Sequence, residues 1–238
     1  MRRHLFKGNY SFLRKYRYPA DRSARFVRAR ARAREFIGLL KARRSIRRLR
    51  PDPVPRELLI EALDAARWAP SAHNAQPWRF VVVTDKRVKE ELAKSMAEAW
   101  RRDLLADGVP EGKVRELTEA SIERFTKAPV LVLACLSMEG MHEYPDERRR
   151  RAERIMAVQS VAAALQNLLL AAHALGLGAC WYCAPLFCPD VVRRVLGLPE
   201  DLEPQALVAL GFPAEEPEPP PRKPLSEVVR WERWRAGA

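Results

Sequence analysis

The sequence has no apolar run of the length that a membrane protein needs. A membrane-spanning helix requires about 18 or more consecutive apolar residues, and Gln166, Asn167 and His173 interrupt the best candidate, Val161–Leu177. The charged N-terminus has no apolar segment behind it, as a secretory signal would have. A hydrophobic fraction of 47% with 31% charged residues is typical of a globular, water-soluble domain. We therefore expect a cytoplasmic protein.

Cysteine is also scarce, which argues against a disulfide framework. The chain has four cysteines: Cys135, Cys180, Cys183 and Cys188. The spacing Cys180-x-x-Cys183 suggests zinc or redox chemistry, but the second ligand pair of a structural zinc site is missing. The apolar residues around this pair indicate a strand, whereas a redox Cys-x-x-Cys motif opens a helix. We predict four buried cysteines and no metal site.

Several catalytic signatures are absent. The sequence contains no Walker A motif, no Gly-x-Gly-x-x-Gly after a strand, no His-Glu-x-x-His and no Gly-x-Ser-x-Gly. The usual sequence marks of ATP binding, dinucleotide binding, zinc proteolysis and serine hydrolysis are therefore missing.

Acidic residues are rare in the first fifty positions. Residues 1–50 hold 18 of the 43 lysines and arginines but only Asp21 and Glu35 as acids, whereas the remainder has 25 basic and 28 acidic residues. A basic arm can bind polyanions by releasing counterions, or it can lie as an Arg-rich helix on the protein's own surface or on a partner subunit. No recognition motif accompanies the charge, so we do not expect nucleic-acid binding.

The hydrophobic periodicity predicts an α+β protein with a central mixed sheet of about four to five strands flanked by long helices. We expect a basic arm over residues 1–35 and one domain over residues 36–238 that ends in a proline-rich extension. Strands are predicted at 78–84, 129–136, 177–183 and 206–210, and helices at about 23–35, 36–41, 55–68, 86–106, 112–127, 152–175 and 189–196. The proline-rich extension ends in an amphipathic piece at 225–234.

The predicted helix 152–175 is apolar nearly all round. A helix of this kind has to be buried on every side. In a chain of 238 residues, this pattern indicates a subunit interface in addition to a core.

Two polar clusters carry the candidate chemistry. Arg43, Arg44 and Arg47 with the Ser45 hydroxyl suit a phosphate monoester, because guanidinium groups hold two oxygens each. Alternatively, they form a solvated Arg-rich run. The second cluster is the loop that precedes Trp78, in which Asn74 and Gln76 can both donate and accept hydrogen bonds, as the edge of a heterocycle demands. Alternatively, these two side chains cap the loop. Together the clusters indicate a site for a phosphorylated heterocycle.

The order of the motifs resembles that of the nitroreductase family. The matching runs are Arg43-Arg-Ser-Ile-Arg47, Pro53-Val-Pro55, Ala69-Pro-Ser-Ala-His-Asn-Ala-Gln-Pro-Trp-Arg-Phe80 and Gly176-Leu-Gly-Ala-Cys-Trp181. The resemblance covers roughly residues 36–225, about four-fifths of the chain.

Two further runs narrow the resemblance. Tyr144-Pro-Asp-Glu-Arg-Arg149 and Leu186-Phe-Cys-Pro-Asp-Val-Val-Arg193 are most similar to the flavin domain at the C-terminus of ligases that build the deazaflavin coenzyme. The ligase domain that normally precedes this flavin domain is not part of the sequence.

The resemblance implies a homodimer with two FMN sites at its interface. It assigns Arg43, Arg44, Ser45 and Arg47 to the phosphate and ribityl chain of FMN. It also implies that the C-terminal segment brings Arg222 back to the phosphate. The isoalloxazine ring would be contacted by Ser71, Asn74 and Gln76, partly across the dimer, and by the strand end at Tyr182, Cys183 and Ala184, where a backbone N–H lies near the flavin N5.

The implied reaction is a two-step hydride transfer. NADH or NADPH would reduce FMN and leave, and a nitroaromatic, quinone or enone-like acceptor would then take the hydride. We assign no catalytic acid or base, because the flavin supplies the chemistry, and we expect His73 to be structural.

Two other functions remain open from the sequence. The first is reduction or binding of a deazaflavin coenzyme, with Lys94, Trp100, Arg101 and Arg102 of the helix pair 86–127 lining the acceptor pocket. The second, of a different class, is polyanion or nucleic-acid binding through residues 1–50.

Overall fold

The computed structural model describes residues 24–234. The chain divides into two compact units, residues 1–41 and residues 42–238. The described part of the first unit is helix α1 (Ala24–Ala42), one continuous 19-residue helix where the sequence predicts two. The second unit begins at Ala42, slightly later than the predicted domain boundary at residue 36.

The second unit contains a four-stranded sheet. Its strands are β1 (Trp78–Val83), β2 (Val130–Ser137), β3 (Gly178–Tyr182) and β4 (Leu202–Gly211), in the order β1-β2-β4-β3. Strand β2 is buried at every position, as expected for a central strand that is apolar on both faces.

The predicted α+β class and strand number are confirmed, but the prediction of a mixed sheet is wrong. All three neighbouring pairs, β1–β2, β2–β4 and β4–β3, are antiparallel. The apolar strand pattern reports burial rather than direction, because any strand covered on both faces is apolar throughout. Within the described residues, parallel pairing is confined to an isolated bridge between Ser45 and Ala179.

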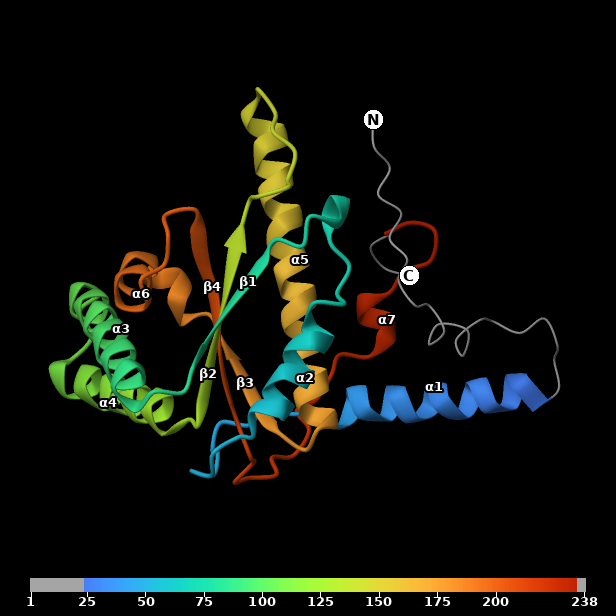
Figure 1. Ribbon diagram of the computed structural model, residues 1–238, viewed down its shortest axis with the longest axis horizontal. Helices are drawn as coiled ribbons and strands as arrows, with labels where there is room; N and C mark the ends of the chain where they lie inside the picture. Colours follow the sequence, from blue (N-terminus) through green and yellow to red (C-terminus); the bar gives the residue numbers. More distant parts are fainter. Residues whose placement is uncertain (1–23, 235–238) are drawn as a thin grey trace. The chain divides into compact units, whose positions relative to one another are not determined.

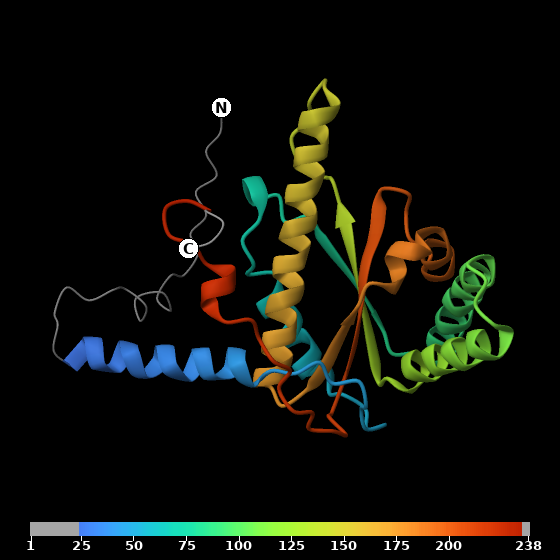
Figure 2. The same ribbon diagram turned by 180° about the vertical axis from the view of Figure 1, so that it is seen from behind.

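Helices cover both faces of the sheet (Figures 1 and 2). Helix α2 (Arg56–Ala66) packs with α5 (Glu147–Ala174) on one face, and α3 (Lys86–Ala106), α4 (Glu111–Lys127) and α6 (Pro189–Leu196) lie on the other. The sequence explains where two of these helices begin. The Asp85 carboxylate accepts a hydrogen bond from the Val88 N–H, and the Asp146 carboxylate from the Arg149 N–H, as N-cap residues do.

Helix α5 is the longest element and the centre of one core. Its 28 residues span about 42 Å at 1.5 Å per residue, and its cap at Asp146 starts it five residues before the predicted position. The length and mean hydropathy of 1.6 over its apolar window satisfy the composition of a membrane span. However, Leu165 and Leu168 are fully buried against the sheet and α2, so α5 is a core helix. Towards its N-terminus, Ile155 and Val158 remain exposed.

The C-terminal segment after β4 is mostly extended, as its prolines predict. Its regular structure among the described residues is the four-residue helix α7 (Leu225–Val228), which covers the start of the amphipathic piece at 225–234. The beginning of the segment pairs with the chain before α2, because the Ala214 N–H donates to the Arg48 carbonyl over 3.0 Å.

Candidate functional site

The extended segment of residues 43–48 runs beside the edge strand β3. Ser45 forms a parallel bridge with Ala179, and the Ile46 N–H donates to the Ala179 carbonyl over 3.0 Å. A Cβ at Gly178 would lie 2.9 Å from Cγ2 of Ile46, closer than side chains approach. Glycine at position 178 therefore permits the segment to lie against the strand.

The side-chain carboxylate of Glu215, from the segment after β4, anchors residues 47 and 48. Oε1 of Glu215 accepts the backbone N–H groups of Arg47 over 2.7 Å and Arg48 over 2.9 Å, and Oε2 lies 3.0 Å from Nε of Arg48. These donors, first the Arg48 N–H, lower the pKa of the Glu215 carboxyl. The Arg47 side chain makes no hydrogen bond within residues 24–234 and is exposed, so its guanidinium is available to a ligand.

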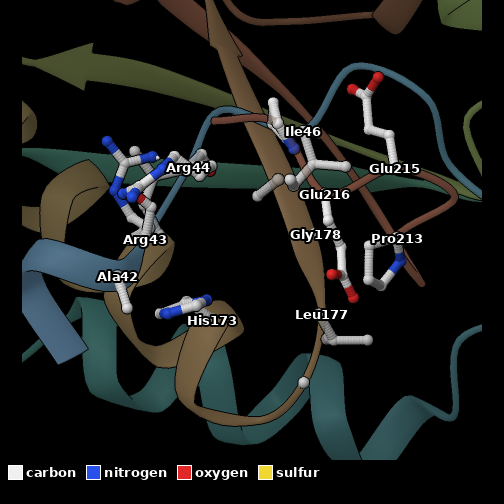
Figure 3. Close-up of a pocket in the computed structure, with 14 residues that line it drawn as sticks. Ala42, Arg43, Arg44, Ile46, His173, Leu177, Gly178, Pro213, Glu215 and Glu216 are labelled. Atoms are coloured by element: carbon white, nitrogen blue, oxygen red, sulfur yellow. Dashed lines mark hydrogen bonds between the residues drawn. The ribbon is translucent and has the colours of Figure 1, made fainter. Parts of the chain in front are cut away.

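Arg43 and Arg44 lie at the start of β3, beside the C-terminal end of α5. Each guanidinium donates to the other residue's carbonyl, over 3.2 Å from Arg43 and 2.8 Å from Arg44. Figure 3 shows both side chains on one side of the β3 ribbon, with Glu215 and Glu216 on the other and His173 below. These residues line a hollow of about 350 Å³. Burial, followed by the charges of Arg43 and Arg44, lowers the pKa of His173.

Tyr182 lies at the opposite end of β3. Its ring meets Phe125 edge-on at 5.1 Å, and the Arg124 guanidinium lies 5.5 Å from the ring centre. Burial raises the pKa of Tyr182, and the charges of Arg124 and Arg47 oppose that rise. The phenol oxygen is buried and has no hydrogen-bond partner in the described chain. Such a group is uncommon in a folded interior and is consistent with an additional polar partner at this position.

A pocket of about 410 Å³ opens where β3 ends, and Cys183 and Ala184 are among its lining residues. Trp100 lines it as predicted, but Lys94, Arg101 and Arg102 do not: Lys94 faces Glu90 and Arg101 binds Glu98. Those predicted positions were wrong because the three basic side chains lie on the outward face of α3. Other lining residues are Met96, Ala99, Asp103, Asp107, Ser121, Arg124, Phe125, Phe187 and Cys188.

The prediction that all four cysteines are buried is wrong for Cys183. The residue is exposed, and Cys188 is half-buried. The strand is buried only as far as Cys180 and ends at Tyr182, so Cys183 lies beyond it, at the N-cap of the short helix η3 (Ala184–Phe187). All four cysteines are free thiols.

A basic hollow next to this pocket was missed by the sequence reasoning. It measures about 560 Å³, and its lining includes Arg47, Arg124 and Lys127, of which Lys127 is paired with Glu123. Arg124 and Lys127 occupy the last turn of α4. Basic residues are common there because their positive charge interacts favourably with the negative end of the helix dipole. Their sequence position therefore gave no sign that they face Arg47.

The loop that carries Ser71, Asn74 and Gln76 has an unusual backbone. His73, Asn74 and Gln76 have φ values of 56°, 53° and 51°, in the left-handed region that costs about 1–2 kcal/mol for most side chains. Two hydroxyls hold this conformation: Oγ of Ser71 accepts the Gln76 N–H over 3.1 Å, and Oγ of Ser160 accepts the Ala72 N–H over 3.2 Å. Strain of this kind is concentrated at functional sites.

The two predicted halves of the site lie apart within one chain. The loop contacts α5 at Ser160, whereas Arg43 and Arg44 lie beside His173 near the other end of that helix. These positions on α5 are about 20 Å apart by the helical rise, and Figure 1 shows the teal loop beside the upper half of α5.

Arg222 is likewise not brought to the other predicted phosphate ligands. It is exposed in the C-terminal segment and donates only to its own neighbours, the carbonyls of Pro220 and Pro221, over 3.2 Å each. A single chain therefore brings together Arg43, Arg44, Ser45, Arg47, Tyr182, Cys183 and Ala184, but not Ser71, Asn74, Gln76 or Arg222.

The sequence of the chain is similar to those of known enzymes. The family model described as the nitroreductase family matches residues 40–212. A protein of Thermus thermophilus named NADH dehydrogenase is 37% identical, covering 79% of this chain and 92% of the relative. A Methanothermobacter thermautotrophicus protein, named as a putative NADH dehydrogenase/NAD(P)H nitroreductase, is 32% identical over 77% of this chain and 80% of its own length.

Solved structures share the fold. Iodotyrosine deiodinase bound to FMN and 3-iodo-L-tyrosine superposes with a TM-score of 0.65 and 26% identity, covering 84% of this chain and all of that one (100%). A BluB-like flavoprotein from Clostridium difficile 630 gives a TM-score of 0.68 at 24% identity, covering 83% of this chain and 98% of its own.

Proposed function

Because the chain belongs to the nitroreductase family and is an FMN-dependent oxidoreductase, we propose that it passes hydride from a reduced nicotinamide to a small acceptor in two half-reactions. The family resemblance predicted from the motifs is confirmed. The proposed acceptor is a nitroaromatic, a quinone or an enone-like compound, and the proposed location is the cytoplasm, where reduced nicotinamides are supplied.

The parallel course of residues 43–48 along β3 is the observation that carries this proposal. It places the guanidinium groups of Arg43 and Arg44 at one end of the strand and Tyr182–Ala184 at the other. FMN has the same polarity, with an anionic phosphate at one end and a flat heterocycle at the other. In an extended segment alternate residues share a face, so Arg43, Ser45 and Arg47 are presented together.

The donor set fits the cofactor. Guanidinium forks match phosphate oxygens, and the unpartnered Tyr182 hydroxyl gives a polar contact at the ring end. When bound, FMN supplies the hydride chemistry. The chain's own residues bind its phosphate, orient its ring against the strand end, and exclude water through Trp100 and Phe125 of the neighbouring pocket.

The site is completed by a second copy in this proposal. The loop that carries Ser71, Asn74 and Gln76 meets α5 at Ser160, about 20 Å by the helical rise from His173, which lies beside Arg43 and Arg44. This separation favours a cofactor that is shared between two chains. Two chains packed antiparallel through α5 bring each loop to the other chain's arginine cluster. The exposed Ile155 and Val158 on α5 provide an apolar surface for this contact.

Replacing Arg47 by alanine tests the phosphate and ribityl assignment. A charge-assisted hydrogen bond contributes about 1.5–3 kcal/mol, so FMN affinity should fall roughly 10- to 150-fold in a fluorescence-quenching titration. Arg50→Ala is the matched control, because Arg50 pairs at the surface with Asp52 and should leave the affinity unchanged. Equal FMN affinity in the Arg47 variant and the wild type would contradict the assignment.

A deazaflavin coenzyme is the second candidate acceptor. Arg124 borders both the acceptor pocket and the basic hollow, whose lining also includes Lys127, paired with Glu123, so an acidic tail attached to a ring in the pocket would lie near these two cations. Arg124→Gln and Lys127→Gln should weaken binding of a deazaflavin with an acidic tail and leave reduction of a neutral quinone unaffected. Equal effects on both acceptors would remove this candidate.

A further inference from the structure

Three potential metal ligands meet away from the arginine cluster. His73 lies in the loop before β1, His142 in the segment after β2, and Glu153 on the N-terminal part of α5. One ligand atom from each lies within 4.8 Å of the other two. Three elements that are distant in sequence therefore converge on one point.

The spacing of these atoms suits a divalent transition metal. Zinc bonds of 2.0–2.2 Å in tetrahedral geometry place ligand atoms about 3.3 Å apart. Nε2 of His73 already lies 3.2 Å from Oε1 of Glu153. The rings of His73 and His142 are stacked, with centroids 3.8 Å apart. Both histidines are exposed, so rotation of His142 about its own side-chain bonds can close the remaining distance.

The environment of Glu153 supplies the charge argument. Its side chain is only 4% exposed, and a buried carboxylate is costly unless it is paired. Its Oε2 accepts the His142 N–H over 3.3 Å. The arginines nearest to it on α5 are paired elsewhere, Arg150 with Glu147 and Arg154 with Glu203. Among the described residues, its one side-chain partner is therefore the His73 imidazole.

We propose that His73, His142 and Glu153 form a zinc-binding site. Two imidazole nitrogens and one carboxylate oxygen are a common protein ligand set for Zn²⁺, and the fourth position is left to water. Mg²⁺ is disfavoured because it prefers an all-oxygen shell. A bound zinc ion would neutralise the buried carboxylate and join the loop to α5 through His73.

The proposed zinc site is connected to the proposed function because His73 lies next to Asn74. Asn74 follows it in the same left-handed stretch, so zinc would restrict the loop that we propose to contact the flavin of the partner chain. This consequence rests on the proposed function, whereas zinc binding itself does not.

The competing explanation is a plain His73–Glu153 hydrogen bond that holds the loop without metal. In that case His142 contributes only its backbone N–H and its stacking contact, and removal of its imidazole nitrogens changes no affinity for metal. The two explanations therefore differ at His142.

Isothermal titration of the untagged, full-length protein with ZnCl₂, after dialysis against a chelator, tests the proposal. We expect one zinc ion per chain and no heat of binding with MgCl₂. His142→Ala and Glu153→Gln should each lower zinc affinity by more than the roughly 10- to 100-fold that loss of a second-shell partner costs. His173→Ala, which removes a histidine outside the cluster, should leave it unchanged. Equal zinc affinity in wild type and His142→Ala, including weak adventitious binding, would overturn the site.

Hydrogen exchange provides the readout for the loop. Zinc should slow exchange of the amides of residues 71–76 in the wild type and have no effect in His142→Ala, with circular dichroism confirming that the variant is folded. If zinc binds but these amides exchange at the same rate, the connection to the loop is wrong. Neither the zinc titration nor the hydrogen-exchange measurement needs flavin, so both can still be interpreted if FMN does not bind.

Discussion

His173 lies beside Arg43 and Arg44 at the start of β3. Burial lowers its pKa, and the charges of Arg43 and Arg44 lower it further. In the unfolded chain the imidazole loses both influences and returns to its ordinary value near 6.5. The unfolded state then holds more protons as the pH falls below that value, so this histidine makes the fold less stable on acidification.

His173 therefore reports on anion binding. We expect FMN or a simple phosphate monoester to raise the pKa of His173, measured from its imidazole resonances by NMR, because the anion offsets the two guanidinium charges. Arg43→Ala should raise the pKa without any ligand. A pKa that stays the same when FMN is saturating would place the phosphate elsewhere.

At the residue scale, residue type indicates which chemistry a side chain can perform, but not which side chains lie beside it. The phosphate role of the Arg43–Arg47 run stays a prediction, drawn from guanidinium chemistry together with the family resemblance. The proximity of Arg124 to Arg47, and of His73 to Glu153, depends on how helices pack. Residues separated by 77 or more positions carry no local pattern that signals contact, so sequence reasoning missed both.

At the scale of elements, the contact between residues 43–48 and β3 depends on Gly178. An added Cβ would meet three atoms of Ile46 at 2.9–3.2 Å, and overpacking of this kind costs about 1–3 kcal/mol. Gly178→Ala should lower the free energy of unfolding by that amount in a urea titration. Gly112→Ala, where the Cβ meets open space, should be neutral or stabilising by up to about 1 kcal/mol.

A double-mutant cycle with Ile46→Ala isolates this contact. The combined variant should lose less stability than the two single variants added together, because the smaller side chain removes the clash. If the stability losses of the two single variants simply add, the cost of Gly178→Ala does not come from its contact with Ile46.

A substitution in the left-handed loop should affect the stability of the fold and the affinity for FMN differently. Gln76→Gly should leave the free energy of unfolding unchanged or raise it by up to about 1 kcal/mol, because glycine adopts positive φ without strain. FMN affinity should fall about 3- to 10-fold through the lost amide hydrogen bond. Glu232→Gly is the control, since Glu232 has the same backbone conformation at φ 61° and no proposed ligand contact. A Gln76 variant with normal FMN affinity would exclude that contact.

Element positions were largely predictable because apolar periodicity and proline positions are local signals. Strands β1, β2 and β3 and helices α3, α4 and α6 lie within one residue of the predicted bounds at each end. The start of α5 was not found, since its first turns are Arg-rich and carry no apolar period, and only the Asp146 cap marks it. Strand direction could not be predicted, because it is decided by connections through space.

At the scale of the whole molecule, the proposed sharing of each FMN site between two chains leads to a distinctive prediction about mixed dimers. At an FMN concentration that fills the wild-type sites but few of the variant sites, Arg47→Ala and Gln76→Gly should each bind less FMN, because every site contains one of the changes. After subunit exchange, a dimer with one chain of each kind has one intact site and one doubly changed site. An equimolar mixture should therefore recover roughly a quarter of the wild-type sites, counted by FMN absorbance after gel filtration. No recovery would mean that both residues serve a site within one chain.

The opposite placement of the two half-sites along α5 also affects how the protein responds to dilution. A cofactor that bridges two chains binds only the assembled form, so FMN and the second chain each strengthen the binding of the other. At low copy number the chains would separate and release flavin together, and specific activity would fall faster than concentration. Abundant FMN would lower the number of chains that a cell needs before activity appears.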